Sequence, residues 1–137
     1  MSTSIVRFRI DFATGSHVGP GKIELLEAIR DSGSLSQAAR NMKMSYRRAW
    51  LLLESLNASF QEPVAVATAG GKGGGGVTVT RFGLSLISGY RELEAAIARL
   101  AARRLQHLMP KVHRQSTADV ASLRRPVVHR RKATQAA

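Results

Sequence analysis

The chain contains no cysteine, so neither a disulfide framework nor thiolate chemistry is available to it. Its apolar runs are only a few residues long, whereas a helix that spans a bilayer needs about 20 apolar residues. The opening stretch "MSTSIVRFRIDF" alternates charged with apolar side chains and lacks the apolar centre of a signal peptide. We therefore expect a cytoplasmic protein without a membrane partner.

Acidic residues are scarce: the chain has 9 Asp and Glu against 21 Lys and Arg, a formal net charge of +12. Such an excess favours a polyanionic partner, first nucleic acid and second an anionic membrane surface. The charge is concentrated in residues 103–137, which hold nine basic residues and one acidic residue. We expect residues 105–137 to form a basic, disordered tail and residues 1–104 to form one domain.

The sequence also lacks the patterns that enzymes and metal sites use. None of the four histidines lies at ligand spacing with another histidine and a carboxylate. No Ser–His–Asp arrangement and no paired carboxylates in an expected cleft stand out. We expect no catalytic residue, no metal and no cofactor, and hence no enzymatic activity.

The first half of the sequence predicts a strand and three helices. "IVRFRIDF" (5–12) alternates apolar with charged residues, as a half-buried strand does, and "ATGSHVGPG" (13–21) predicts a loop. A helix over 22–32 stops at Gly33. "SLSQ" predicts a capping box, with Ser34 as the cap and Gln37 reaching back. A short helix follows Ser34, and a longer helix follows its own cap, Ser45. These two helices together predict a helix-turn-helix.

The second half predicts a hairpin and a long helix. "PVAVATA" and "VTVT" flank "GGKGGGG" and form two strands joined by a glycine-rich tip. The glycine run is neither a P-loop, because it lacks the required Gly and Ser/Thr, nor a dinucleotide fingerprint, because no helix follows. The hairpin is therefore interpreted as a wing, and its expected tip consists of Gly70, Gly71, Lys72, Gly73, Gly74, Gly75 and Gly76.

Thr80 caps the last helix, expected over about 80–104. Apolar residues recur along it at alternating spacings of four and three, a pattern typical of a helix that pairs with another. The stripe either packs on its own domain or forms a dimer seam, and we favour the seam. The predicted fold is mainly α with a small β-hairpin: a winged helix-turn-helix with a long C-terminal dimerisation helix. The seam residues are Leu86, Tyr90, Leu93, Ile97 and Leu100.

Three blocks of the sequence occur in the order and spacing of a known family. "SGSLSQAA", "SYRRAW" and "GGKGGGGVTVTRFG" resemble the N-terminal DNA-binding domain of the ModE family of molybdenum-responsive transcriptional regulators, with Val79 where that pattern has leucine. The resemblance covers roughly residues 5–100. It implies a winged-helix domain that dimerises and binds an inverted repeat. Members of the family continue into molybdate-binding domains, whereas we expect this chain to correspond to the DNA-binding half alone.

The helix that begins after Ser45 is the expected recognition helix, because the second helix of such a motif enters the major groove. Arg47 and Arg48 suit guanine or phosphate, although they also fit a solvated helix surface. For Gln37 a capping role explains the residue as well as a phosphate contact does. Trp50 is expected in the core rather than stacked on a base. The full set of expected DNA contacts is Ser36, Gln37, Lys43, Ser45, Tyr46, Arg47, Arg48 and Lys72.

These features together predict a homodimeric, sequence-specific regulator that binds double-stranded DNA in the bacterial nucleoid and controls molybdenum-related genes. Two alternatives stay open. One is an architectural protein that binds DNA through charge alone. The other is an interaction subunit that pairs with a full-length ModE-like partner and modulates its response.

Overall fold

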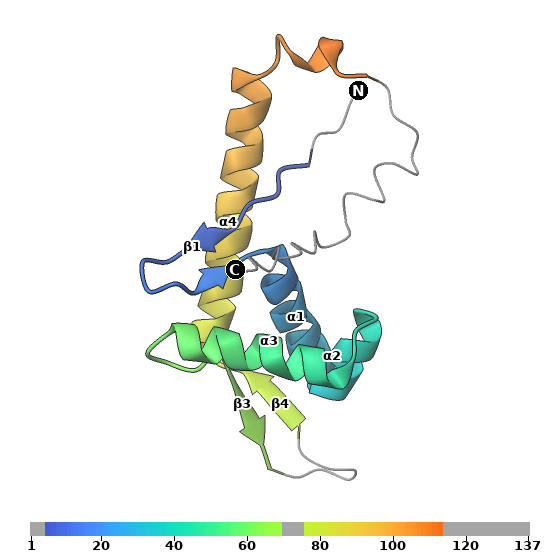
Figure 1. The fold of residues 1–137 in the computed structure, drawn as a ribbon, viewed down its shortest axis with the longest axis vertical. Helices are drawn as coiled ribbons and strands as arrows, with labels where there is room; N and C mark the ends of the chain where they lie inside the picture. The colour runs from blue at the N-terminus through green and yellow to red at the C-terminus, as the bar shows by residue number, and fades with distance from the viewer. Residues whose placement is uncertain (1–4, 70–75, 114–137) are drawn as a thin grey trace, which may run out of the picture.

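The computed structural model describes residues 5–69 and 76–113. Figure 1 shows α1, α2 and α3 packed together, a hairpin pointing away from them, and α4 extending well beyond them in the other direction. The predicted fold, a winged helix-turn-helix with a long last helix, is confirmed. The elements in chain order are β1 (Ile10–Asp11), β2 (His17–Val18), α1 (Pro20–Ser32), α2 (Leu35–Asn41), α3 (Tyr46–Ser59), β3 (Ala65–Thr68), β4 (Gly76–Val79), α4 (Arg81–Arg104) and the 3₁₀ turn η1 (Met109–Lys111).

The core lies between α1, α2 and α3. Helix α1 begins at Pro20, whose fixed φ suits the first helical position. It ends at Gly33, which has a left-handed φ of 68° and donates its N–H to the Ile29 carbonyl. The small residues Ala38 and Ala39 of α2 let the neighbouring helices approach closely. The core side chains that these three helices bury are Ile23, Leu25, Leu26, Ile29, Leu35, Ala38, Ala39, Ala49, Leu53 and Leu56.

The N-terminal segment is paired over a shorter stretch than its alternation predicts. Only Ile10 and Asp11 form a ladder, and their partners are Val18 and His17, in the stretch expected to be a loop. The alternation itself is real, since every second side chain from Val6 to Phe12 is half-buried. Phe8 and Phe12 pack against the core although neither is strand-paired, so the segment has the same period as a longer strand.

Tyr90 of α4 anchors this segment. Its ring stacks on Phe8 with a centroid separation of 4.7 Å, and its hydroxyl donates to the Phe8 carbonyl at 2.7 Å. Burial raises the pKa of Tyr90 above its ordinary value of 10.0. The folded state therefore keeps a proton that the unfolded chain loses, so this contribution to stability is full below about pH 10 and falls as the pH rises further.

Tyr90→Phe is expected to lower the free energy of unfolding by about 1 kcal/mol at pH 7, because one part-buried hydrogen bond is lost. The substitution should also remove the decrease in the free energy of unfolding above pH 10, because the ionisable hydroxyl is gone. Urea unfolding followed by circular dichroism at pH 7 and at about pH 10.5 tests both effects. Tyr46→Phe is the matched control, since Tyr46 is 56% exposed and its change should stay within about 0.5 kcal/mol. Equal effects of the two substitutions would contradict the prediction.

The predicted hairpin is confirmed, and side chains hold its base. Strands β3 and β4 pair antiparallel, with Ala65 opposite Val79 and Thr68 opposite Gly76. Asn57 of α3 accepts the Val64 N–H at 2.8 Å and donates to the Ala65 carbonyl at 3.3 Å. Of the expected wing tip, only Gly76 lies within the described residues. Gly70, Gly71, Lys72, Gly73, Gly74 and Gly75 lie outside them.

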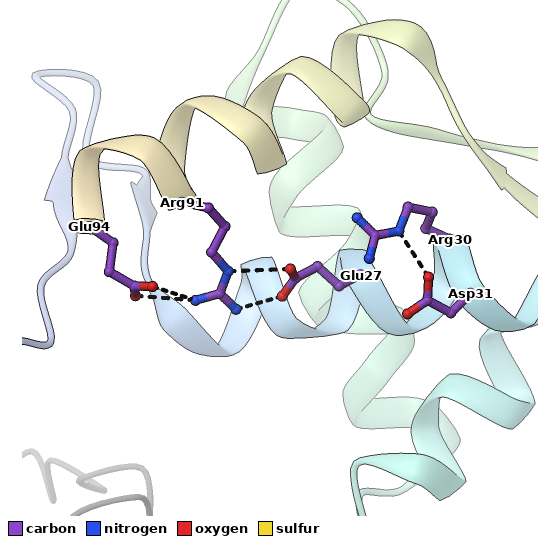
Figure 2. Close-up of polar contacts among 5 residues, drawn as sticks. All are labelled: Glu27, Arg30, Asp31, Arg91 and Glu94. Atoms are coloured by element: carbon purple, nitrogen blue, oxygen red, sulfur yellow. Dashed lines mark hydrogen bonds and ion pairs between the residues drawn. The ribbon is translucent and has the colours of Figure 1, made fainter. Parts of the chain in front are cut away.

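Helix α4 begins where it was predicted, because Thr80 caps it. The Thr80 hydroxyl accepts the Gly83 N–H at 3.0 Å and donates to the Pro63 carbonyl at 2.7 Å. An ion cluster joins α4 to α1: Figure 2 shows Arg91 between the carboxylates of Glu27 and Glu94. These hydrogen bonds, first that to Glu27, raise the pKa of the Arg91 guanidinium.

The predicted dimer seam on α4 stays a prediction, and its residues differ in exposure within one copy. Tyr90 is only 3% exposed and Leu86 packs against the core, so both contact their own domain. Farther along, Leu93 is 41% exposed, Leu100 is 46% exposed and Ile97 is half-buried. Helix α4 is longer than the helices beside it, so the rest of the domain covers only its first turns (Figure 1).

Candidate nucleic-acid interface

The turn between α2 and α3 is built by local contacts. Lys43 adopts a left-handed φ of 56°, which reverses the chain, and the Met44 N–H donates to the Ala39 carbonyl. Ser45 then accepts the Arg48 N–H on its hydroxyl at 3.1 Å. This cap satisfies one of the free N–H groups of the first turn, so α3 begins at Tyr46. The helix-turn-helix thus forms from signals within a few residues.

The side chains expected to contact DNA are all on the surface of this motif, apart from Lys72, which lies outside the described residues. These side chains lie near one another because α2, the turn and the first turn of α3 belong to one motif. They need no direct contact with each other for this. The exposed residues are Ser36, Gln37, Lys43, Ser45, Tyr46, Arg47 and Arg48. That they contact DNA stays a prediction.

The motif carries charge of one sign. Between Ser32 and Leu53 the sequence has no acidic residue, but it has the basic residues Arg40, Lys43, Arg47 and Arg48. Over the described part of the chain, ion pairs engage Arg9, Arg30 and Arg91. Arg47 and Arg48 have no carboxylate partner there. Their charges, added to the positive end of the α3 dipole, make this surface attractive to an anion.

The capping box is only half formed. Ser34 accepts the Gln37 N–H at 3.2 Å, as expected. The Gln37 side chain does not reach back to Ser34, however. It donates to Asn41 Oδ1 at 2.8 Å and accepts from Arg40 Nη2 at 3.2 Å. Gln37, Arg40 and Asn41 stand at positions i, i+3 and i+4 of α2, the spacing at which side chains meet on a helix surface. The sequence contains this signal, and the prediction did not use it.

Trp50 does not lie in the core as expected, since it is 45% exposed. The buried stripe of α3 runs through Ala49, Leu53 and Leu56. Trp50 follows Ala49 by one residue, a rotation of about 100° around the helix axis, which takes it off the buried stripe. The expectation rested on the three-residue spacing between Trp50 and Leu53, and this spacing alone does not place both side chains on the buried face.

A buried lysine links α3 to the N-terminal hairpin, which is formed by β1 and β2. Lys22 is 6% exposed, and its Nζ donates to the His17 carbonyl at 2.9 Å and to Ser55 Oγ at 3.0 Å. Burial lowers the pKa of Lys22, because the charged form loses hydration. Through Ser55 this contact fixes the C-terminal half of α3 against β2 and α1.

The described residues contain no group of three His, Asp or Glu side chains that could hold a metal ion. None of the helices that the structure describes is long and apolar enough to cross a membrane.

Comparison with known proteins found several relatives. "Molybdenum transport protein ModE" of Azotobacter vinelandii is 36% identical over 103 residues, which are 72% of this chain and 38% of that protein. "Molybdenum-pterin-binding protein MopB" of Rhodobacter capsulatus is 41% identical over 87 residues, 64% of this chain and 32% of that protein. "DNA-binding transcriptional dual regulator ModE" of Escherichia coli K12 is 41% identical over 71 residues, 52% of this chain and 27% of that protein.

The chain therefore spans only 27% to 38% of the length of these three relatives. No protein-family model matches it. The relatives are named as regulators and as transport or binding proteins, and not as enzymes.

Proposed function

Because the chain is homologous to the N-terminal region of the ModE regulators, we propose that it is a DNA-binding transcriptional regulator that recognises a specific sequence. The observation that carries the proposal is the start of α3. Arg47 and Arg48 are exposed there, have no carboxylate partner among the described residues, and lie in a segment without acidic side chains. Two such positive charges at the start of the proposed recognition helix are suited to base edges and to phosphates.

In the proposed complex, α3 enters the major groove with its N-terminal turn against the base edges. Arg47 and Arg48 bond to guanine or to phosphate. Ser45 and Tyr46 lie at the same end of the helix. Side chains of α2 and the turn contact the sugar-phosphate backbone, and the glycine-rich wing with Lys72 contacts flanking phosphates. The backbone contacts from α2 and the turn are assigned to Ser36, Gln37 and Lys43.

The regulator is proposed to act as a homodimer. An apolar groove of about 330 Å³ opens between the N-terminal hairpin and α4, and its lining includes Phe12, Phe60, Phe82 and Leu93. Gly89 also lines the groove, and a side chain added there would meet nothing within 4 Å. Leu100 lies seven residues beyond Leu93 on α4, which is nearly the same side of the helix, and it is 46% exposed. A second copy is the proposed occupant, because a two-fold dimer matches an inverted repeat in DNA.

A role in controlling molybdenum-related genes is part of the proposal. It is supported by the names of the relatives, which concern molybdenum transport and molybdenum-pterin binding. Action on the genome places the protein in the cytoplasm, on the nucleoid.

Selection of genomic DNA fragments by the purified full chain, at about physiological salt and with and without molybdate, tests the proposal. We expect enrichment of an inverted repeat, and sequencing identifies the neighbouring genes. Arg47→Ala should weaken binding to that repeat by roughly 5- to 100-fold, the range for loss of a base contact.

Arg99→Ala is the matched control, since it removes the same charge from an exposed position on α4. It should leave binding to the repeat nearly unchanged. Equal losses for both variants, or binding without any enriched sequence, would overturn the proposal in favour of an architectural protein. A repeat bound only together with a ModE-like partner would identify an interaction subunit instead.

A further inference from the structure

Two large aromatic side chains lie exposed on the recognition helix. Tyr46 is 56% exposed and Trp50 is 45% exposed, and they lie one helical turn apart on α3. The chain has few aromatic residues: one Trp, two Tyr and four Phe. Exposed aromatic side chains leave a large apolar area in contact with water. Leaving two of them on the surface of one short helix calls for a partner.

The fold offers no partner for these rings within the described residues. The ring contacts there join Phe8 to Tyr90 and connect three phenylalanines near the start of α4. Neither Tyr46 nor Trp50 lines the apolar groove proposed for the second copy. Their surface is therefore separate from the dimer surface.

The charge around the rings favours DNA over a protein as the partner. Tyr46 and Trp50 lie in the acid-free segment and flank Arg47 and Arg48. The first carboxylate on this face belongs to Glu54, one turn beyond Trp50. A carboxylate is repelled by phosphates, so the DNA-facing part of α3 ends between Trp50 and Glu54.

The major groove contains one apolar group, the C5-methyl of thymine, and apolar side chains recognise it by direct contact. We propose that Tyr46 and Trp50 contact thymine methyl groups and are specificity-determining residues for A·T pairs. Four residues of helix advance by about 6 Å, close to two base-pair steps of roughly 3.4 Å. The two rings thus meet thymines about two pairs apart. The inference rests on the proposed DNA-binding function and names the base that this surface reads.

Replacing thymine by deoxyuridine in the selected repeat tests this contact, because it removes the methyl group and leaves the hydrogen-bonding pattern intact. For the wild-type chain we expect the affinity to fall roughly threefold to tenfold for each contacted thymine. For Trp50→Ala the same replacement at its thymine should change the affinity by less than about twofold. Trp50→Phe should restore part of the penalty, because it keeps an apolar ring.

The emission of Trp50 gives an independent readout, because it is the only tryptophan in the chain. Binding to the repeat should shift or quench this emission, and binding to the deoxyuridine version should change it less. Leu84→Ala serves as the control variant, since Leu84 is 42% exposed on α4 and the full deoxyuridine penalty should persist there. Circular dichroism melting of each variant confirms that folding is intact.

The outcomes separate this inference from the function on which it rests. A wild-type chain that enriches no sequence overturns both. A chain that enriches a repeat but shows the same deoxyuridine penalty with and without Trp50 overturns the thymine contact alone. Trp50 emission that binding to the repeat leaves unchanged overturns the thymine contact as well.

Discussion

Gly83→Ala is expected to destabilise the domain by about 3 kcal/mol or to prevent folding. A Cβ at this position would lie 2.1 Å from the Val64 carbonyl oxygen and 2.7 Å from Val79 Cγ1. That carbonyl cannot move freely, because it accepts the Thr80 N–H, and Val64 is fully buried. Overpacking of this kind costs about 1–3 kcal/mol or more, out of a total of about 5–15 kcal/mol for a typical domain.

Urea unfolding at pH 7 measures this effect, and Gly21→Ala is its matched control. Gly21 lies in α1, where an added Cβ would meet nothing within 4 Å. Alanine there should raise the free energy of unfolding by up to about 1 kcal/mol, because it is the better helix former. If both variants unfold at the wild-type urea concentration, α4 does not pack on the base of the wing as described.

Leu93→Glu is expected to convert the proposed dimer to a monomer and to weaken binding to the inverted repeat by roughly 100-fold or more. Leu93 lines the apolar groove between α4 and the N-terminal hairpin. A carboxylate there would have to be buried without a partner when the second copy docks. A monomer that engages one half-site also loses the gain of about 10²–10⁴ that linked binding provides.

Sedimentation equilibrium and DNA titration of the same samples test this prediction, with Leu84→Glu as the control. Leu84 has nearly the same exposure, 42% against 41%, and lies on the same helix. It lies nine residues away, which is two and a half turns, so it faces the opposite side of α4. The control should remain dimeric with full affinity. A dimer that survives Leu93→Glu, or is lost with Leu84→Glu, would place the interface elsewhere.

The sequence by itself determined where α2, α3 and α4 begin and where the hairpin lies, whereas α1 begins at Pro20, before its predicted start at residue 22. Ser34, Ser45 and Thr80 each cap a helix through a hydroxyl that accepts the N–H three residues later. Gly33 ends α1 in a left-handed conformation. Such contacts join residues that are neighbours in the chain, so they act wherever the segment lies. The order of these elements was sufficient to predict the winged helix-turn-helix.

Only the tertiary structure decided which faces are covered. The spacing on α3 and α4 indicates amphipathic helices, but it does not say how far a neighbouring element extends along each one. Trp50 was expected inside and is exposed, whereas Tyr90 was expected at a dimer seam and is buried under Phe8. Both outcomes depend on contacts between distant segments. Phe8 and Tyr90 lie 82 residues apart in the chain, and no local pattern records that they meet.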